Sequence, residues 1–333
     1  MSALSVEDLR GGIPESRHQV SVAVTDADGR LIAHAGQPDL RTFMRSAAKP
    51  FQALPVIEDG AADRFALSSE ELALACASHN SERRQVELVR GLLARIGCGE
   101  SDLACGPHRP LSQDLALPTE RDAASDDVPR SPVASNCSGK HGAMLALARH
   151  HGWTIEGYER AEHQVQGRCR DTMARWTGLS PSDIGEAVDG CGVVTFAVPL
   201  RAMATAFARL ARSDEAAPRR VVAAMTGHPD LVAGRGRPCT ALMQAYPGRL
   251  LTKVGAEGVY GAALLDRGLG IALKVEDGHT WAAVVALIAV LGALDVEPAP
   301  ANVLPRFASP ELRNTRGVVV GRLESRGGIA GAA

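Results

Sequence analysis

The sequence predicts an α+β fold in which a largely antiparallel sheet is combined with a helical region. Strand-like runs gather near the two ends of the chain, in residues 19–36 and 249–278, whereas helical patterns fill the middle. Repeated strand–helix–strand units are not evident in the sequence, so a parallel sheet is not expected. We expect a single domain over residues 1–333, with a helical insert at roughly residues 60–240.

The first elements have clear local signals. Alternating apolar residues flank an ADG turn in residues 19–36, and Gly29 can supply the positive φ that a hairpin needs. A helix is expected to begin near Ser46 and to continue through AAKPFQALPVI. Pro50 is compatible with it because the first turn does not need the missing N–H.

The middle of the chain is expected to be mainly helical. A capping box predicts a helix start at Ser68, and Ser81 opens the next helix. Residues 118–132 are polar and bounded by proline, which predicts an exposed loop. The remaining expected elements are helices at 136–152, 158–176 and 201–212, a strand at 193–200, a loop with a short helix at 213–240, and a buried apolar helix at 279–294.

The composition excludes several classes of function. The chain has 333 residues and a formal charge of −2, so no basic excess indicates nucleic acid or an acidic membrane surface. The seven cysteines are scattered without a CxxC motif, and the first residues lack the pattern of a secretory signal. We therefore expect a cytoplasmic protein. No glycine-rich nucleotide motif follows a strand, so a nucleotide cofactor is not expected.

Ser46 and Lys49 form the first candidate catalytic pair. Their i, i+3 spacing at a helix start places both side chains on one face, one turn apart. A serine hydroxyl becomes a good nucleophile when a base takes its proton, and a neutral lysine can do this. Because lysine ordinarily titrates near ~10.4, burial or a second cation must lower its pKa by about three units. The alternative is a capping serine followed by a surface lysine.

Two later motifs support a catalytic role for this pair. SHN at Ser78 and KVG at Lys253 follow S-x-x-K in the order found in penicillin-binding proteins and class A β-lactamases. In that arrangement Ser46 attacks, Lys49 is the base, and Ser78 pairs with Lys253. The short spacing between the two serines, and Val254 in place of the usual Thr or Ser, depart from the β-lactamase pattern.

Six stretches resemble the rhizobial-type (class 3) L-asparaginases, the asparaginase II family. They are RSAAKPFQALPVIEDG, SHNSE, CGPHRP, NCSGKHGAML, DGCGVVTFAVPL and KVGAEGVYGAAL, and the resemblance as a whole spans roughly residues 17–295. The resemblance implies a serine-β-lactamase-like fold, a homodimer, and hydrolysis of L-asparagine to L-aspartate and ammonia (EC 3.5.1.1). It also implies two Ser-Lys tandems, Ser46 with Lys49 and Ser78 with Lys253.

The resemblance further implies zinc (Zn²⁺) near the active site, held by Cys137, Lys140 and Cys191 with water as the fourth ligand. Spacing alone favours two buried core thiols over a metal site, and a lysine must lose its proton to coordinate. Cys137 and Lys140 are nevertheless i, i+3 at a helix start, so they can face one point. Whether zinc is essential stays open.

We predict that five residues bind the substrate. An arginine suits the substrate α-carboxylate, and Arg109 is a second candidate beside Arg45, although a structural salt bridge is the alternative for either. A backbone N–H near the KVG strand would stabilise the oxyanion. The candidate substrate-binding residues are Arg45, Asn80, His141, Asp189 and Gly255.

Two rival functions remain. The first is another Ser-Lys hydrolase on the same scaffold, namely a glutaminase, D-aminopeptidase, esterase or β-lactamase. One methylene separates asparagine from glutamine, and a pocket discriminates that by only about 1–3 kcal/mol. The second is a non-catalytic, metal-dependent asparagine-binding regulator in which Cys137, Lys140 and Cys191 form a structural site.

Overall fold

The computed structural model describes residues 3–109, 111, 131–299 and 304–331. Most of the loop expected at 118–132 lies outside the described residues. The chain forms two compact units. Unit 1 comprises Met1–Ala47, Val198–Arg212 and Ala241–Ala333, and unit 2 comprises Ala48–Ala197 and Ser213–Thr240.

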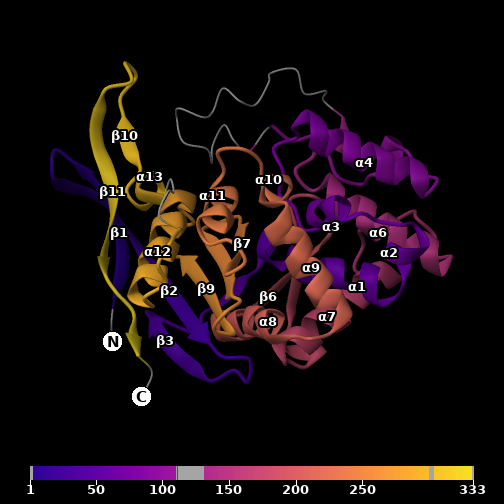
Figure 1. Cartoon of the computed structure of the whole chain (residues 1–333), viewed down its shortest axis with the longest axis horizontal. Coiled ribbons are helices and arrows are strands. Elements are labelled where there is room, and N and C mark those ends of the chain that lie inside the picture. Colours follow the sequence, from indigo (N-terminus) through magenta and orange to yellow (C-terminus); the bar gives the residue numbers. More distant parts are fainter. Residues whose placement is uncertain (1–2, 110, 112–130, 300–303, 332–333) are drawn as a thin grey trace. The chain divides into compact units, whose positions relative to one another are not determined.

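Unit 1 is built on an antiparallel sheet. The strand order is β10-β11-β1-β2-β9-β8-β7, and β3 pairs with both β2 and β12. Figure 1 shows β11, in yellow, beside β1, in indigo, so both ends of the chain enter one sheet. The strands are β1 Leu4–Arg10, β2 Ile13–Thr25, β3 Leu31–Ala35, β7 Leu250–Gly255, β8 Val259–Leu264, β9 Leu269–Val275, β10 Glu311–Arg313, β11 Val319–Gly327 and β12 Ala330–Gly331. The predicted α+β class with an antiparallel sheet is confirmed.

The hairpin turn predicted at Gly29 is confirmed, and a second hairpin turn lies at Gly268. Gly29 has φ 85° between β2 and β3, and Gly268 has φ 65° between β8 and β9. Asp26 Oδ1 accepts hydrogen bonds from the N–H groups of Asp28 and Arg30, which fixes the first turn. Glycine is needed at both positions because other L-residues rarely adopt positive φ.

Helices cover the sheet of unit 1. Helix α8 (Leu200–Arg212) packs on β2, β8 and β9, and α12 (Thr280–Ala293) packs on β1, β9 and β11. Gly270 permits the close approach of α8, since a Cβ there would overlap the backbone of Ala204. The other elements are β4 Arg41–Phe43, the 3₁₀ turn η1 Arg45–Ala48, α13 Leu304–Ala308, and α11 Pro238–Ala245, which enters from unit 2. No helix among the described residues is long and apolar enough to cross a membrane.

Unit 2 is mainly helical. Helix α1 packs against α6, α7 and α9, and α3 packs against α4, α6 and α9. Strand β5 pairs antiparallel with β6, which runs on into unit 1. The helices are α1 Lys49–Glu58, α2 Ala61–Arg64, α3 Ser69–Ala75, α4 Arg83–Arg95, α6 Ser138–His151, α7 Gln164–Thr177, α9 Ala216–Gly227 and α10 Pro229–Val232. The shorter elements are η2 Glu100–Asp102, η4 Pro132–Ala134, η5 Pro181–Asp183, β5 Gly185–Val188 and β6 Val194–Pro199.

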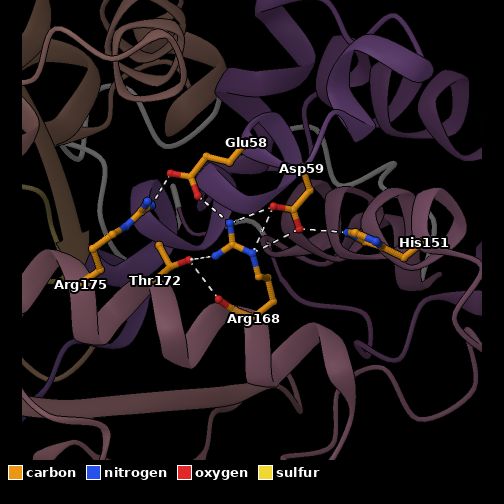
Figure 2. A network of polar contacts seen from close by, with 6 residues as sticks. All are labelled: Glu58, Asp59, His151, Arg168, Thr172 and Arg175. Atoms are coloured by element: carbon orange, nitrogen blue, oxygen red, sulfur yellow. Dashed lines mark hydrogen bonds and ion pairs between the residues drawn. The ribbon is translucent and has the colours of Figure 1, made fainter.

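An ionic network fixes the end of α1 (Figure 2). Arg168 on α7 donates to Glu58 Oε2 at 2.7 Å and to Asp59 Oδ1 at 2.8 Å, and His151 on α6 lies 2.9 Å from Asp59 Oδ2. Burial alone would raise the pKa of Asp59, but hydrogen bonds from Arg168 and His151 outweigh it, so its pKa is lowered. The helix that begins at Lys49 is thereby tied to two neighbours.

Two boundaries differ from the sequence prediction. The helix expected at 158–176 begins only at Gln164, because His163 Nδ1 accepts from the N–H of Val165 and caps it there. The segment 213–240 holds α9, α10 and the start of α11 rather than one short helix. Its prolines fall at helix starts, where they are tolerated.

Candidate active site

Ser46 and Lys49 lie on one continuous stretch of helical turns. Ser46 belongs to η1, at the end of the first segment of unit 1, and Lys49 is the first residue of α1, in unit 2. Pro50 follows in the first turn, as expected. Arg45 has φ 50°, a left-handed conformation that costs a non-glycine residue energy. The strained residue therefore directly precedes the candidate nucleophile.

Lys49 bonds to the second candidate serine. Its side chain is 1% exposed, and Nζ lies 2.9 Å from Ser78 Oγ and 2.5 Å from the carbonyl oxygen of Ala77. Both residues belong to unit 2. The structure thus brings together one member of each predicted tandem.

The loop that carries Ser78 is fixed by backbone bonds and a buried arginine. The N–H of Ser78 donates to the carbonyl of Val232. Arg237, 0% exposed, donates through Nη1 to the carbonyl of Ser78 at 3.3 Å and to Asn80 Oδ1 at 2.9 Å. Asn80 is a predicted substrate-binding residue, and here its amide oxygen is engaged by the protein.

The other predicted catalytic residues lie in unit 1. Lys253 is 1% exposed on β7 and donates from Nζ to the carbonyl of Val254 at 2.9 Å. Gly255 ends β7, and a Cβ there would lie 2.7 Å from the carbonyl oxygen of Met44. Glycine therefore lets the strand end approach the segment that leads into Ser46. The pairing of Lys253 with Ser78 stays a prediction.

The three predicted metal ligands converge within unit 2. Cys137 precedes α6, Lys140 lies in its first turn, and Cys191 lies between β5 and β6. Lys140 Nζ is 3.0 Å from Cys191 Sγ, and the Cys137 thiol interacts with Cys191 while its Sγ also lies 3.1 Å from Asn136 Oδ1. The Lys140 amine and the two thiols therefore form one contiguous cluster.

The charges of these groups are unequal. The hydrogen bond from Cys137 and the charge of Lys140 lower the pKa of Cys191 to about 4 against the effect of burial. The same thiol contact and burial raise the pKa of Cys137 to about 12. Burial alone would lower the pKa of Lys140, but the charges of Cys191, Cys137 and Asp189 outweigh it and raise it. Without a metal the group is a thiolate–ammonium pair beside a neutral thiol.

The donor set fits zinc. Zinc prefers thiolate sulfur and nitrogen as ligands. Catalytic zinc sites typically have three protein ligands and one open coordination position. Among the described residues, no three His, Cys, Asp or Glu side chains form a group that could hold a metal ion. A site here therefore needs Lys140 as the third ligand, in its neutral form.

His141, a predicted substrate-binding residue, is wholly buried. Its Nδ1 lies 2.5 Å from Tyr158 Oη, which itself accepts from the N–H of Ala104 at 3.0 Å. The direction of the hydrogen bond between Tyr158 and His141 depends on the imidazole tautomer, because a hydroxyl oxygen can accept two hydrogen bonds. Burial and the charge of Lys140 lower the pKa of His141 to about 3, so the ring is neutral. Its buried Nε2 has no hydrogen-bond partner among the described residues.

The remaining predicted residues lie nearer the surface. Asp189 is half-buried, and its Oδ1 accepts from the N–H of Gly190 at 2.8 Å. Arg45 is half-buried, and Arg109 is exposed.

Residues with weak sequence signals also support the site. Arg237, Tyr158 and His79 are buried and hold predicted residues in place. Lone arginine, tyrosine and histidine residues are common in any sequence, so only their tertiary contacts identify them.

The chain was compared with known proteins. A family model described as L-asparaginase II matches residues 6–325. No curated protein sequence matches the chain.

Among solved structures, Mglu in its native form is 17% identical, with a TM-score of 0.45 over 84% of this chain and 65% of that one. The chain thus spans about two thirds of the length of Mglu. A β-lactamase from Mycobacterium bovis is 16% identical over 82% of this chain and 94% of that one, with a TM-score of 0.41. An octameric penicillin-binding protein homologue from Pyrococcus abyssi is 13% identical over 82% and 73%, with a TM-score of 0.40.

Proposed function

The chain belongs to the L-asparaginase II family, and from this premise we propose that it hydrolyses L-asparagine to L-aspartate and ammonia. The single observation that carries the proposed chemistry is the buried bond between Lys49 Nζ and Ser78 Oγ. A buried lysine bonded to a hydroxyl is placed to exchange a proton with it.

In the proposed reaction, Ser46 Oγ attacks the side-chain amide carbon of asparagine while Lys49 takes the hydroxyl proton. The carbon–nitrogen bond then breaks, and ammonia leaves with a proton passed on through Ser78 and Lys253. Water hydrolyses the resulting β-aspartyl ester and restores Ser46. Backbone N–H groups of Ser46 and of the strand end at Gly255 stabilise the oxyanion. The approach of Gly255 to Met44 supports this role.

Cys137, Lys140 and Cys191 would hold zinc, which supplies a positive charge and an open ligand position when bound. His141 would offer its unpartnered Nε2 to the substrate for a hydrogen bond, and Arg45 and Asp189 would bind the α-carboxylate and α-amino groups. We also propose a cytoplasmic homodimer.

Ammonia release tests this proposal. The purified protein is incubated with L-asparagine, with L-glutamine in parallel, and Ser46→Ala is compared with the control Ser213→Ala, a half-buried serine of unit 2. We expect release from asparagine, abolished only by Ser46→Ala. Turnover retained in Ser46→Ala would assign the nucleophile elsewhere, and mass spectrometry of a trapped ester would show whether Ser78 carries it.

The rival hydrolases make different predictions. Release from glutamine alone, or cleavage of an ester or lactam panel without ammonia from asparagine, would identify one of them. Asparagine binding without any product would identify the non-catalytic regulator.

A further inference from the structure

His79 is a buried histidine that the proposed reaction does not use. It follows Ser78 in the loop after α3 and is 0% exposed. The candidate catalytic hydroxyl and the imidazole are therefore on adjacent residues of one short loop.

The hydrogen bonds of His79 fix its tautomer. The N–H of Ser81 donates to Nδ1 at 3.0 Å, so Nδ1 carries the lone pair and Nε2 carries the proton. Nε2 then donates to Ser138 Oγ at 2.9 Å. Burial and the charges of Lys49 and Arg237 lower the pKa of His79 to about 3, which keeps the ring neutral.

These bonds join two parts of unit 2. Ser138 begins α6 and lies between Cys137 and Lys140 in the sequence. The N–H of His79 also donates to the carbonyl of Asn136 at 3.1 Å. In addition, Ser81 Oγ donates to the carbonyl of Ala134 at 2.5 Å. The imidazole thus spans from the loop of Ser78 to the turn that carries two candidate metal ligands.

We infer that His79 is a positioning residue, which holds Ser78 Oγ within reach of Lys49 by fixing loop 77–81 to the first turn of α6. The effect of His79 on turnover rests on the proposed function. The attachment of loop 77–81 to α6 through His79 is a property of the fold, and it can be measured without a substrate.

His163 provides a matched control. It is also buried in unit 2, its Nδ1 accepts from the N–H two residues ahead at 3.1 Å, and its Nε2 lies 3.0 Å from the carbonyl of Thr154. The bonding pattern is that of His79, but no predicted site residue takes part in it. A purely structural histidine should behave like this one.

Two amide substitutions separate the two bonds of His79. The amide oxygen of asparagine lies near the position of Nδ1 and preserves the acceptor, whereas the glutamine amide reaches the position of Nε2 and preserves the donor. We expect His79→Asn to lower kcat for asparagine by about 10- to 100-fold with KM little changed, because misplaced reacting groups cost up to about 100-fold.

His79→Gln should restore most of the turnover, and Ser138→Ala should reproduce His79→Asn. The double variant should be no worse than either single one, since both remove the same bond. His163→Asn should lower Tm without changing kcat.

Hydrogen exchange tests the link directly. His79→Asn should speed amide exchange in the peptide covering 134–145, and Ser138→Ala should do so in the peptide covering 76–82. Exchange unchanged in both peptides would overturn the inference, as would normal kcat in His79→Asn. A wild-type protein that releases no ammonia would instead refute the proposed function, and the exchange result would still decide the link.

Discussion

Lys49 and Ser78 share a buried hydrogen bond of 2.9 Å, although the sequence pattern assigns them to different pairs. Lys49 is predicted to serve Ser46, three residues before it, and Ser78 is predicted to serve Lys253. In unit 2 the lysine reaches Ser78 directly. In the proposed reaction, Lys49 would relay a proton between the hydroxyl groups of Ser46 and Ser78.

Lys49→Arg is expected to abolish most turnover. A guanidinium stays protonated and cannot act as a base, and loss of a general base costs about 10²–10⁴ in rate. The control is Lys274→Arg on β9, whose Nζ bonds backbone carbonyls of Val275 and Glu276. Measuring kcat for both variants, with Tm as a check of folding, tests whether Lys49 acts as the general base. Near-normal turnover in Lys49→Arg would remove the lysine from the mechanism.

Cys191→Ser and Lys140→Met are expected to lose bound zinc. Each removes one of the three converging donors, so zinc retained after dialysis, measured by elemental analysis, should fall well below that of wild type. Cys98→Ser serves as the control, since Cys98 is a free thiol outside the cluster.

Zinc affinity should also rise with pH, because Lys140, whose pKa is raised, must lose its proton to coordinate. A wild-type protein that retains no zinc would contradict the proposed site.

Arg168→Met is expected to destabilise the protein by roughly 2–3 kcal/mol, since it breaks charged hydrogen bonds to two partly buried carboxylates. Arg83→Met, which breaks an exposed pair with Glu87, should cost at most about 0.5 kcal/mol. Urea unfolding measures both. Equal effects would mean that the network contributes no more than a surface pair.

The contribution of Asp59 should depend on pH. Its pKa is lowered in the folded protein, so the stability it adds is present above its unfolded pKa, near ~4, and is lost as pH falls through the folded value. The stability difference between wild type and Asp59→Asn should therefore be largest near neutral pH and shrink towards pH ~3. A difference that grows on acidification would refute the sign of the shift.

Gly255→Ala is expected to reduce kcat, because the new Cβ would lie 2.7 Å from the carbonyl of Met44 and displace one of the two segments. Gly292→Ala in α12 is the control, since nothing lies within 4 Å of a Cβ there. That change should stabilise the helix by about 0.5–1 kcal/mol. Wild-type kcat in Gly255→Ala would show that the approach is unimportant for turnover.

Local rules predicted the elements whose signals are short-range. Pro50 in the first turn of α1, the capping box of Ser68 and Glu71, and the positive φ of Gly29 all depend on residues within a few positions of one another. The strands that join the chain ends were harder to predict. Register between Leu4 and Gly327 is set by pairing across the whole chain, which periodicity does not contain.

The residues of the candidate site also divide into those with short-range sequence signals and those identified only by long-range contacts. Cys137 and Lys140 share a helix turn, and their spacing predicts that they can face one point, whereas Cys191 is predicted only by the family resemblance. The structure places the Cys191 thiol 3.0 Å from Lys140 Nζ. His79 gives no such signal, because its meaning depends on Ser138, which lies 59 positions away.

The left-handed backbone of Arg45 has a consequence for evolution in the laboratory. A non-glycine residue with φ 50° costs about 1–2 kcal/mol that glycine would avoid. A library selected for heat resistance alone should therefore enrich glycine at this position. A library selected for asparagine turnover should keep arginine. Comparing the two populations would separate the stability cost of the left-handed backbone from the contribution of the Arg45 side chain to turnover.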